Sequence, residues 1–373
     1  MFDSLKLKGD KIIWIIVFAL SLFSIMVVYS AAGWSDLINH ILRLIIGLIT
    51  MYVVHLIPFK YFSKLGQIGY FTSLVLLLLV FLIGVSINGA SRWIDIAGLQ
   101  FQPSDIAKIT VILYMARQIS VNRSKISKEK EFLRHILMPL ILVCALILPN
   151  NFSTSALVFV NGLVLIFLAK IRMRFIIKVV GFALVFALLI ITPTMLTPYI
   201  TKWLPRAHTW VSRTDTYSDN QNYNLTAEKH QQTQALVAIQ NGGIQGAGPG
   251  KSSQRSILPL PASDFIFAII LEEYGLIGGV TALLFYLILL FRAIRISLKV
   301  DSVFGRLIVV GLMFSLVFQA LVHMLVSVGV MPVTGQTLPL ISMGGTSLVF
   351  TFISIGVVLS VSRNSLQGNY AKD

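Results

Sequence analysis

Three carboxylates lie in or beside one apolar stretch of this chain. In SILPLPASDFIFAIILEEYG, residues 256–275, Asp264 stands at the start of the apolar run, and Glu272 and Glu273 lie inside it. Acidic groups are costly at membrane depth and usually mark paired or functional positions. At the boundary of such a run Asp264 can stay ionised and reach water, which suits a general base acting on an exposed, lipid-carried substrate. On one continuous helix Glu272 would lie about 12 Å deeper, at ~1.5 Å per residue.

Two cations that fall inside apolar runs, Arg43 and Lys108, are candidate partners for these carboxylates. One interpretation pairs Glu272 and Glu273 with Arg43 or Lys108, so that buried ion pairs hold the helices together; it is favoured for Glu273. Lys108 also has a local partner in Asp105, three residues earlier in QPSDIAK, a stretch that predicts the start of a helix. The functional alternative turns Lys108 or Arg43 toward the bundle interior, to meet an anionic substrate or a buried Glu.

A polar stripe is expected on one later helix, because Gln319, His323 and Ser327 repeat every four residues. Hydrogen bonding to a neighbouring helix is the expected role of such a stripe. No Cys, Asp or Glu stands at ligand spacing from His323, so no metal motif surrounds it. QGAGPGKSS resembles a phosphate-binding loop, but Gln245 occupies a position where that motif needs glycine. Its glycines instead predict tight turns or close backbone approach to a ligand.

The elements that must position these residues are membrane helices. Of the 373 residues, 56% are hydrophobic and 12% charged, whereas a typical soluble domain is about 25% charged. The apolar runs are continuous rather than alternating, so the sequence predicts an all-α polytopic membrane protein with one bundle over residues 1–373. About ten spans are expected, at roughly 12–30, 38–57, 67–87, 104–119, 134–149, 152–169, 174–192, 264–291, 305–330 and 339–361.

The distribution of basic residues predicts the orientation of this bundle. The net charge is +15, but the basic residues form short clusters between apolar runs, which argues against nucleic-acid binding. Most of the 30 Lys and Arg residues lie in the N-terminus, in alternate loops and in the C-terminal tail, so both termini are expected to be cytoplasmic. The first apolar run is too long for a usual signal peptide and is interpreted as the first span. The single cysteine, Cys144, excludes an intrachain disulfide.

The one long connection, residues 193–263, is then a large extracytoplasmic loop. It is polar, with prolines at its edges and a glycine cluster near its end. Loops of this kind are usually functional or disordered. Within it, LTAEKHQQTQALVAIQNGG is either an amphipathic helix near the membrane interface or a plain loop.

Five stretches, spread in order over nearly the whole chain, carry a family resemblance. They are NGASRWI (88–94), FQPSDIAK (101–108), NGGIQGAG (241–248), LPLPASDFIFAIILEEYGLIGG (258–279) and PVTGQTLPLISMGGTSL (332–348). The chain resembles the SEDS family (shape, elongation, division and sporulation), represented by FtsW and RodA. NGASRWI and SDFIFAIILEEYG look more like the FtsW division branch, and LISMGGTS resembles FtsW of the Bacteroidota type. Three positions depart from the family pattern: PNNFSTS replaces an acidic PDxGT motif, and His323 and Met343 stand where Asn and Tyr are common.

The resemblance implies a peptidoglycan glycosyltransferase that polymerises lipid II at the outer face of the bacterial cytoplasmic membrane. Asp264 falls on the family's essential aspartate and would deprotonate the 4-hydroxyl of the acceptor GlcNAc, which attacks C1 of the donor MurNAc with inversion. The leaving diphosphate needs cationic stabilisation. Arg92, beside Trp93 in an outer loop, either contacts this diphosphate or anchors the loop at the interface. The full set of candidates comprises Arg92, Lys108, Arg213, Lys251 and Arg255 for the diphosphate, Glu272 as a substrate-site residue, and Glu273, Arg43, Gln319 and His323 as supporting residues.

The same resemblance implies the cofactors and partners. No nucleotide cofactor is needed and no metal ligand is assigned, while a divalent cation is left open. The expected partners are lipid II, a class B penicillin-binding transpeptidase, other divisome proteins and the membrane. Two other functions stay open. One is a lipid II flippase, for which Arg43, Lys108, Glu272 and His323 could supply a polar path; the other is a non-catalytic scaffold for the transpeptidase.

Overall fold

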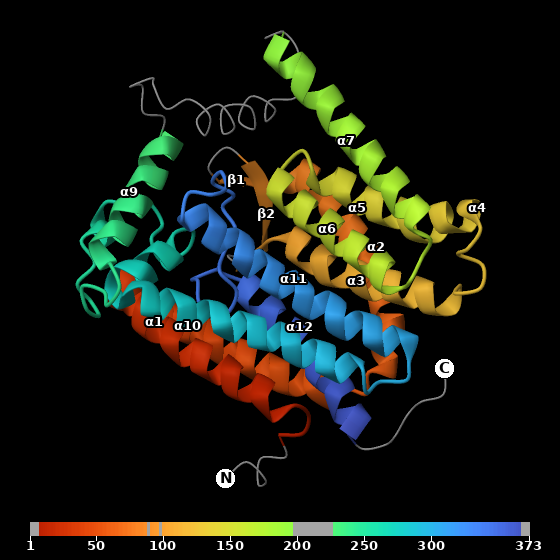
Figure 1. The fold of residues 1–373 in the computed structure, drawn as a ribbon, viewed down its shortest axis with the longest axis horizontal. Helices are drawn as coiled ribbons and strands as arrows, with labels where there is room; N and C mark the ends of the chain where they lie inside the picture. The colour runs from red at the N-terminus through yellow and green to blue at the C-terminus, as the bar shows by residue number, and fades with distance from the viewer. Residues whose placement is uncertain (1–6, 88–89, 97–98, 197–226, 367–373) are drawn as a thin grey trace.

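The computed structural model describes residues 7–87, 90–96, 99–196 and 227–366, which form a bundle of helices (Figure 1). This confirms the predicted all-α polytopic membrane fold. Five of the described helices are long and apolar enough to cross a membrane, and α6 is a shorter apolar helix. The longer helices are α1 (Lys11–Leu56), α2 (Lys60–Ile83), α3 (Pro103–Val121), α6 (Phe152–Leu168), α7 (Met173–Leu196), α9 (Ala227–Gly242), α10 (Ile266–Ser297), α11 (Val303–Ser327) and α12 (Ser347–Leu366).

The first helix, α1, contains two antiparallel arms joined at Gly33. Gly33 has φ 78° and ψ −169°, a conformation that is essentially restricted to glycine. The two arms pack against each other: Ser24 Oγ lies 3.0 Å from His40 Nε2, and the rings of Trp14 and His55 meet edge-on at 5.3 Å. The expected spans at roughly 12–30 and 38–57 are therefore both present, as the arms of one helical hairpin.

Gly275 gives α10 the same kind of reversal, with φ 65° and ψ −167°. A Cβ built on Gly279 would lie 2.4 Å from Leu271 Cδ2 and 3.4 Å from Phe267 Cζ. In a straight helix, residues eight and twelve apart are separated by about 12 and 18 Å. The chain before Gly275 therefore folds back on the chain after it. The expected span at roughly 264–291 is corrected accordingly: residues 266–274 form a short re-entrant helix, and 276–297 form the crossing segment.

The fifth expected span, at roughly 134–149, is interrupted. It consists of α4 (Glu129–Phe132), a π-helical turn (Leu133–Leu137) and α5 (Met138–Ile147). Pro139, in the first turn of α5, has no N–H to donate to the preceding turn, which fits the change of helix type.

A small antiparallel sheet follows α2, where the sequence analysis placed only a loop. Its strands are β1 (Val85–Ile87), β2 (Ala90–Ile96) and β3 (Leu99–Phe101), in the order β1-β2-β3. Val85 pairs with Trp93, and Ile94 pairs with Phe101. The Asn-Gly dipeptide between β1 and β2 is a strong hairpin signal that was overlooked.

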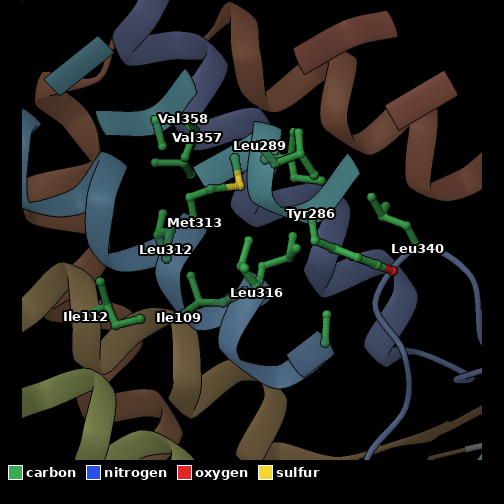
Figure 2. Close-up of a cluster of buried hydrophobic side chains, with 14 of the residues drawn as sticks. Ile109, Ile112, Tyr286, Leu289, Leu312, Met313, Leu316, Leu340, Val357 and Val358 are labelled. Carbon is green, nitrogen blue, oxygen red and sulfur yellow. The ribbon is translucent and has the colours of Figure 1, made fainter. Parts of the chain in front are cut away.

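A second re-entrant segment, residues 332–346, replaces the start of the tenth expected span. Its backbone is held in place by side chains of the bundle: Gln319 Nε2 donates to Thr337 O at 2.9 Å, and Tyr286 Oη donates to Pro339 O. Figure 2 shows Tyr286 reaching toward Leu340 beside the buried core of α3, α10, α11 and α12. Pro339 and the Gly344–Gly345 pair disfavour a helix here, so α12 begins at Ser347 rather than near 339.

The start of α1 and the end of α12 lie on the same side of the bundle. Lys11 and Ser365 line one cavity, and the two helices pack along their lengths. We call this the terminal side. The opposite side, called the loop side, carries the Gly275 turn and α9, which packs against α10 and α11. Of the two alternatives for LTAEKHQQTQALVAIQNGG, the helix is correct for its residues 227–242.

Candidate active site

Asp264 lies in a tight turn immediately before the re-entrant helix of α10. The backbone N–H groups of Ser263 and Asp264 both donate to Leu260 O, at 3.0 and 3.1 Å. Ser263 Oγ donates to Asp264 Oδ1 at 2.9 Å, and the carboxylate is only partly buried. The second oxygen, Oδ2, lies 3.7 Å from the position that a Cβ on Gly335 would occupy. Asp264 is therefore a partly accessible carboxylate held against the 332–346 segment.

The depth order of the three carboxylates is the reverse of the one predicted from a straight helix. Because α10 reverses at Gly275, Glu272 and Glu273 lie next to the turn on the loop side. Asp264 lies at the other end of the re-entrant helix, about 12 Å further into the bundle at ~1.5 Å per residue. The expectation that Asp264 is the outermost of the three is therefore wrong.

The Asp264 turn is fastened to the 332–346 segment by backbone carbonyls. Met343 N donates to Ala262 O at 2.9 Å, and Ser342 Oγ donates to Ser263 O at 2.7 Å. Irregular backbone at membrane depth is stable only where the surrounding protein or a water-filled cavity satisfies it. The two re-entrant segments satisfy each other, and Asp264 stands at their junction.

Lys108 forms the local ion pair that the sequence predicts and also lines an interior cavity. Its ammonium forms the expected local ion pair with Asp105, with Nζ 2.8 Å from Oδ1, and also donates to Gln319 Oε1 at 3.2 Å. It faces the bundle interior as well, where it lines a cavity of about 40 Å³ together with Gln319, Pro339 and Ser347. A cavity of this size holds about one or two water molecules.

The polar stripe on α11 connects this cavity to the 332–346 segment. Gln319 bridges Lys108 and Thr337 O, so it makes the expected helix-to-helix contact and also supports the re-entrant segment. His323 Nδ1 lies 2.7 Å from Gln336 O. The sequence analysis missed these carbonyl acceptors. The signal available for them was the row of Gln, Thr and Ser in PVTGQTLPLISMGGTSL, opposite a polar helix face.

Arg92 lies in β2 and fastens the sheet to the neighbouring helices. Its Nε donates to Asn150 O in the turn between α5 and α6, at 2.7 Å. The adjacent Trp93 ring reaches within 3.9 Å of the Cβ position of Gly345, in the 332–346 segment. The contact to Asn150 supports the anchoring role, and binding of a diphosphate remains a prediction.

Replacing Arg92 by Lys should separate these two roles. Lysine keeps the charge and one donor for Asn150 O but loses the planar fork that binds a diphosphate with two hydrogen bonds. We expect lipid II polymerisation by the purified variant to fall about tenfold or more, with an unchanged melting temperature. Arg306→Lys is the matched control, because Arg306 also donates to a backbone carbonyl, that of Asp301, on the terminal side. If Arg92→Lys polymerised lipid II at the wild-type rate, anchoring of the sheet would be the whole role of Arg92.

Glu272 and Glu273 are not paired with Arg43 or Lys108 in the described chain, so that expectation is wrong. Both carboxylates are buried, with 1% of each residue exposed. Loop residues 252–254 supply donors to both oxygens of Glu272, among them Ser253 N at 3.0 Å and Ser253 Oγ at 2.7 Å. Ser252 N, at 3.3 Å, and Ser30 Oγ donate to Oε1 of Glu273. Hydroxyls and backbone N–H groups thus take the place of cations.

These contacts predict different effects for the two amide substitutions. Glu272→Gln replaces an accepting oxygen by an NH₂ group that meets existing donors, so it should lower the free energy of unfolding by about 1–3 kcal/mol. In the described chain Glu273 Oε2 has no hydrogen-bond partner, so Glu273→Gln keeps the accepting oxygen and should cost less. Thermal unfolding of the two purified variants in detergent measures the difference. Equal losses would contradict the hydrogen-bonding pattern.

Among the remaining basic candidates, those that the structure describes do not gather around Asp264. Arg255 Nη1 donates to Ser30 O at 3.1 Å, beside Glu273, and Lys251 is exposed in the same loop. Arg43 lies on the second arm of α1, without a salt bridge in the described chain. Arg213 lies outside the described residues. Of the described cations named from the sequence, Lys108 is placed against the 332–346 segment, in the cavity that it lines with Pro339, whereas Arg92 contacts Asn150.

The glycine-rich stretch before this loop closely approaches α10. Ala247 N and Gly248 N donate to the carbonyl oxygens of Glu272 and Glu273, at 2.9 and 3.0 Å. The glycines therefore allow the loop backbone to enter the break in α10. Among the described residues, no group of three His, Cys, Asp or Glu side chains could hold a metal ion.

The family comparison covers almost the whole chain. The FtsW/RodA/SpoVE family model, described as a cell cycle protein, matches residues 10–367. The peptidoglycan glycosyltransferase MrdB of Escherichia coli K12 is 32% identical over 363 residues, covering 95% of this chain and 94% of that protein. A probable peptidoglycan glycosyltransferase FtsW of Geobacter metallireducens is 31% identical over 370 residues and covers 95% of each chain.

Solved structures with the same fold include two close matches. One belongs to a peptidoglycan synthase complex described for its structural coordination of polymerization and crosslinking. It is 28% identical to this chain, with a TM-score of 0.79, and the match covers 96% of this chain and 99% of that chain. The other is the rod shape determining protein RodA of Thermus thermophilus, with a TM-score of 0.70, 27% identity, and coverage of 95% and 97%.

Proposed function

Because this chain belongs to the FtsW/RodA/SpoVE family, we propose that it polymerises lipid II at the outer face of the cytoplasmic membrane, with Asp264 as the general base. The chain is a peptidoglycan glycosyltransferase, like the relatives that it matches over nearly their full length. The observation that carries the residue assignment is the position of Asp264. It is a partly accessible carboxylate at the junction of two re-entrant segments, in a bundle whose other candidate acids, Glu272 and Glu273, are buried and committed to the 252–254 loop.

In the proposed reaction Asp264 accepts the proton of the acceptor's 4-hydroxyl group. The bond between this oxygen and C1 of the donor MurNAc forms on one face of the sugar, while the bond from C1 to the diphosphate oxygen breaks on the other. The products are a β-1,4-linked strand and undecaprenyl diphosphate. Lys108, held in place by Asp105 and Gln319, and Arg92, on the sheet, are the cations proposed to stabilise the departing diphosphate.

The test of this function is polymerisation by the purified full-length protein. With fluorescently labelled lipid II in detergent, we expect glycan strands that separate as a ladder on a gel. Detergent removes the membrane, so a flippase has nothing to transport across, and a scaffold produces no strands. Absence of strands from folded protein, with or without a class B transpeptidase added, would favour one of those two alternatives.

The division role and the partner are proposed on narrower grounds. The FtsW-like motifs NGASRWI and SDFIFAIILEEYG support septal synthesis. A similar solved structure comes from a complex that joins polymerization to crosslinking, which supports a class B penicillin-binding transpeptidase as the partner. Other divisome proteins are further proposed partners.

The proposed site requires the loop side to be extracytoplasmic. Both ends of the described bundle lie on the terminal side, and the Lys/Arg bias makes that side cytoplasmic. Reporter fusions placed after residue 220 and at the C-terminus should therefore report opposite sides of the membrane. An alkaline phosphatase fusion should be active at the first position, and a fluorescent protein should be active at the second. If both fusions reported the same side of the membrane, Asp264 would lie on the side opposite to its substrate.

A further inference from the structure

The terminal side of the bundle carries a basic cavity that the proposed reaction does not use. It has a volume of about 320 Å³ and lies where the start of α1, the end of α10 and the end of α12 meet. Pockets of this size hold small ligands or headgroups. The polar and charged residues in its lining are Asp10, Lys11, Arg292, Arg295, Lys299, Ser362 and Ser365.

Among the described residues of this lining the one carboxylate is Asp10, and it already has hydrogen-bond and ion-pair partners. As the N-cap of α1, its Oδ1 accepts from Ile12 N and Ile13 N at 3.0 and 3.1 Å. Arg292 Nε lies 3.2 and 3.0 Å from the two oxygens of Asp10, and Arg292 Nη2 also donates to Oδ2. Asp10 and Arg292 therefore neutralise each other and fix the wall between α1 and α10.

Three cations of the lining remain without a neutralising partner. Lys11, Arg295 and Lys299 are exposed, and within the described ranges none of them forms a salt bridge. Arg295 is held in place by the ring of Phe291, 5.8 Å away. Like charges around one concavity repel each other and concentrate anions there. The cavity therefore favours a ligand with negative charge.

The surroundings of the cavity select a lipid over a free anion. Ile12, in the lining, is 39% exposed, and Ile294, one residue before Arg295, is 43% exposed. In a membrane protein such side chains face acyl chains. Arg295 lies twenty residues from the Gly275 turn, or about 30 Å at ~1.5 Å per residue, which is the thickness of the hydrocarbon core. The cations are thus at headgroup level, with apolar surface beside them.

We propose that this cavity binds the phosphate headgroup of an anionic phospholipid from the leaflet on the terminal side. Lys11, Arg295 and Lys299 contact the phosphate, and the acyl chains lie along Ile12 and Ile294. Basic pockets between membrane helices bind headgroups in this way. Because the cavity touches three helices that come from both ends of the chain, the bound lipid also links the two ends of the bundle.

Native mass spectrometry of the full-length protein, titrated with phosphatidylglycerol or phosphatidylcholine, tests the proposal. Wild-type protein should bind phosphatidylglycerol at least about tenfold more tightly, since each cation near the headgroup contributes about fivefold. The double variant Arg295→Gln, Lys299→Gln should lower that affinity about twenty-five-fold. Neither residue takes part in the Asp10–Arg292 pair, so the wall of the cavity remains intact.

Lys60→Gln is the matched control, because Lys60 is also exposed and lies over an aromatic ring, that of Tyr61, at 5.4 Å, but outside the cavity. Its affinity for phosphatidylglycerol should equal that of the wild type. Three results would overturn the proposal: unchanged affinity in the double variant, equal binding of the two lipids, or displacement of phosphatidylglycerol by millimolar inorganic phosphate. The last result would identify a site for a free anion.

Discussion

Asp264→Asn is expected to lower lipid II polymerisation by ~10²–10⁴-fold, because the amide keeps the shape of the carboxylate but cannot accept the proton of the acceptor hydroxyl. Fold and yield should be unchanged. Asn keeps an oxygen in the place of Oδ1 for Ser263 Oγ, and the backbone hydrogen bonds of the turn do not involve the side chain. The measurement is the rate of strand formation by purified variant and wild-type protein in detergent, compared at equal melting temperature.

Asp95→Asn is the matched control for this experiment. Asp95 is an exposed carboxylate on β2, and it also accepts from a side chain, Gln100, at 3.2 Å. Asp95 pairs with Gln100 of β3, and the polymerisation rate of Asp95→Asn should match that of the wild type. Comparable rates for Asp264→Asn and Asp95→Asn would exclude Asp264 as the base, and the flippase or scaffold function would then be preferred.

Gly275→Ala is expected to prevent stable folding or to lower the free energy of unfolding by ~2–6 kcal/mol. Two costs add together. The backbone conformation, φ 65° and ψ −167°, is strained for alanine. A Cβ at this position would also lie 2.3 Å from Ile244 O and 2.5 Å from Gly246 N. Both are backbone atoms of the inserted loop, and they cannot move aside without breaking its hydrogen bonds to α10.

Gly33→Ala separates the two costs. Gly33 has nearly the same backbone conformation, also at the turn of a helical hairpin, but no atom lies within 4 Å of its Cβ position. We therefore expect only the strain cost there, about 1–3 kcal/mol. Thermal unfolding of both variants in one detergent gives the comparison. If Gly275→Ala were as stable as Gly33→Ala, the close approach of the loop to α10 would add nothing to the loss of unfolding free energy.

Periodicity and hydropathy were sufficient to predict which segments are helical. They were insufficient where the chain turns back within the membrane. An apolar run such as 264–291 looks the same whether it crosses once or reverses at a glycine, because hydropathy records composition and not direction. The tenth span was misplaced for a similar reason: LPLIS is apolar, but the carbonyl groups of Pro339 and of the preceding Thr337 accept hydrogen bonds from Tyr286 and Gln319, side chains of other helices.

The candidate site was predictable in its chemistry but not in its assembly. Asp264 and Lys108 stood out because charges are rare in apolar runs. The partners of Glu272 and Glu273 were predicted as cations, since only charges were considered for buried acids. The structure uses serine hydroxyls and backbone N–H groups, which are too common in sequence to be recognised there. Contacts with the 332–346 segment depend on tertiary folding and leave no local pattern.

The reversal at Gly275 also changes how this part of the chain enters the bilayer during synthesis. Insertion machinery partitions a segment by its apolar content, and a carboxylate near the centre of a span costs ~2.5–3.5 kcal/mol. From Leu276 to Phe291 the chain has no charged residue, and 276–297 is roughly 33 Å long at ~1.5 Å per residue, enough to cross alone. Asp264, Glu272 and Glu273 all precede it, so none of them has to be partitioned into lipid. They join the membrane domain later, already surrounded by protein.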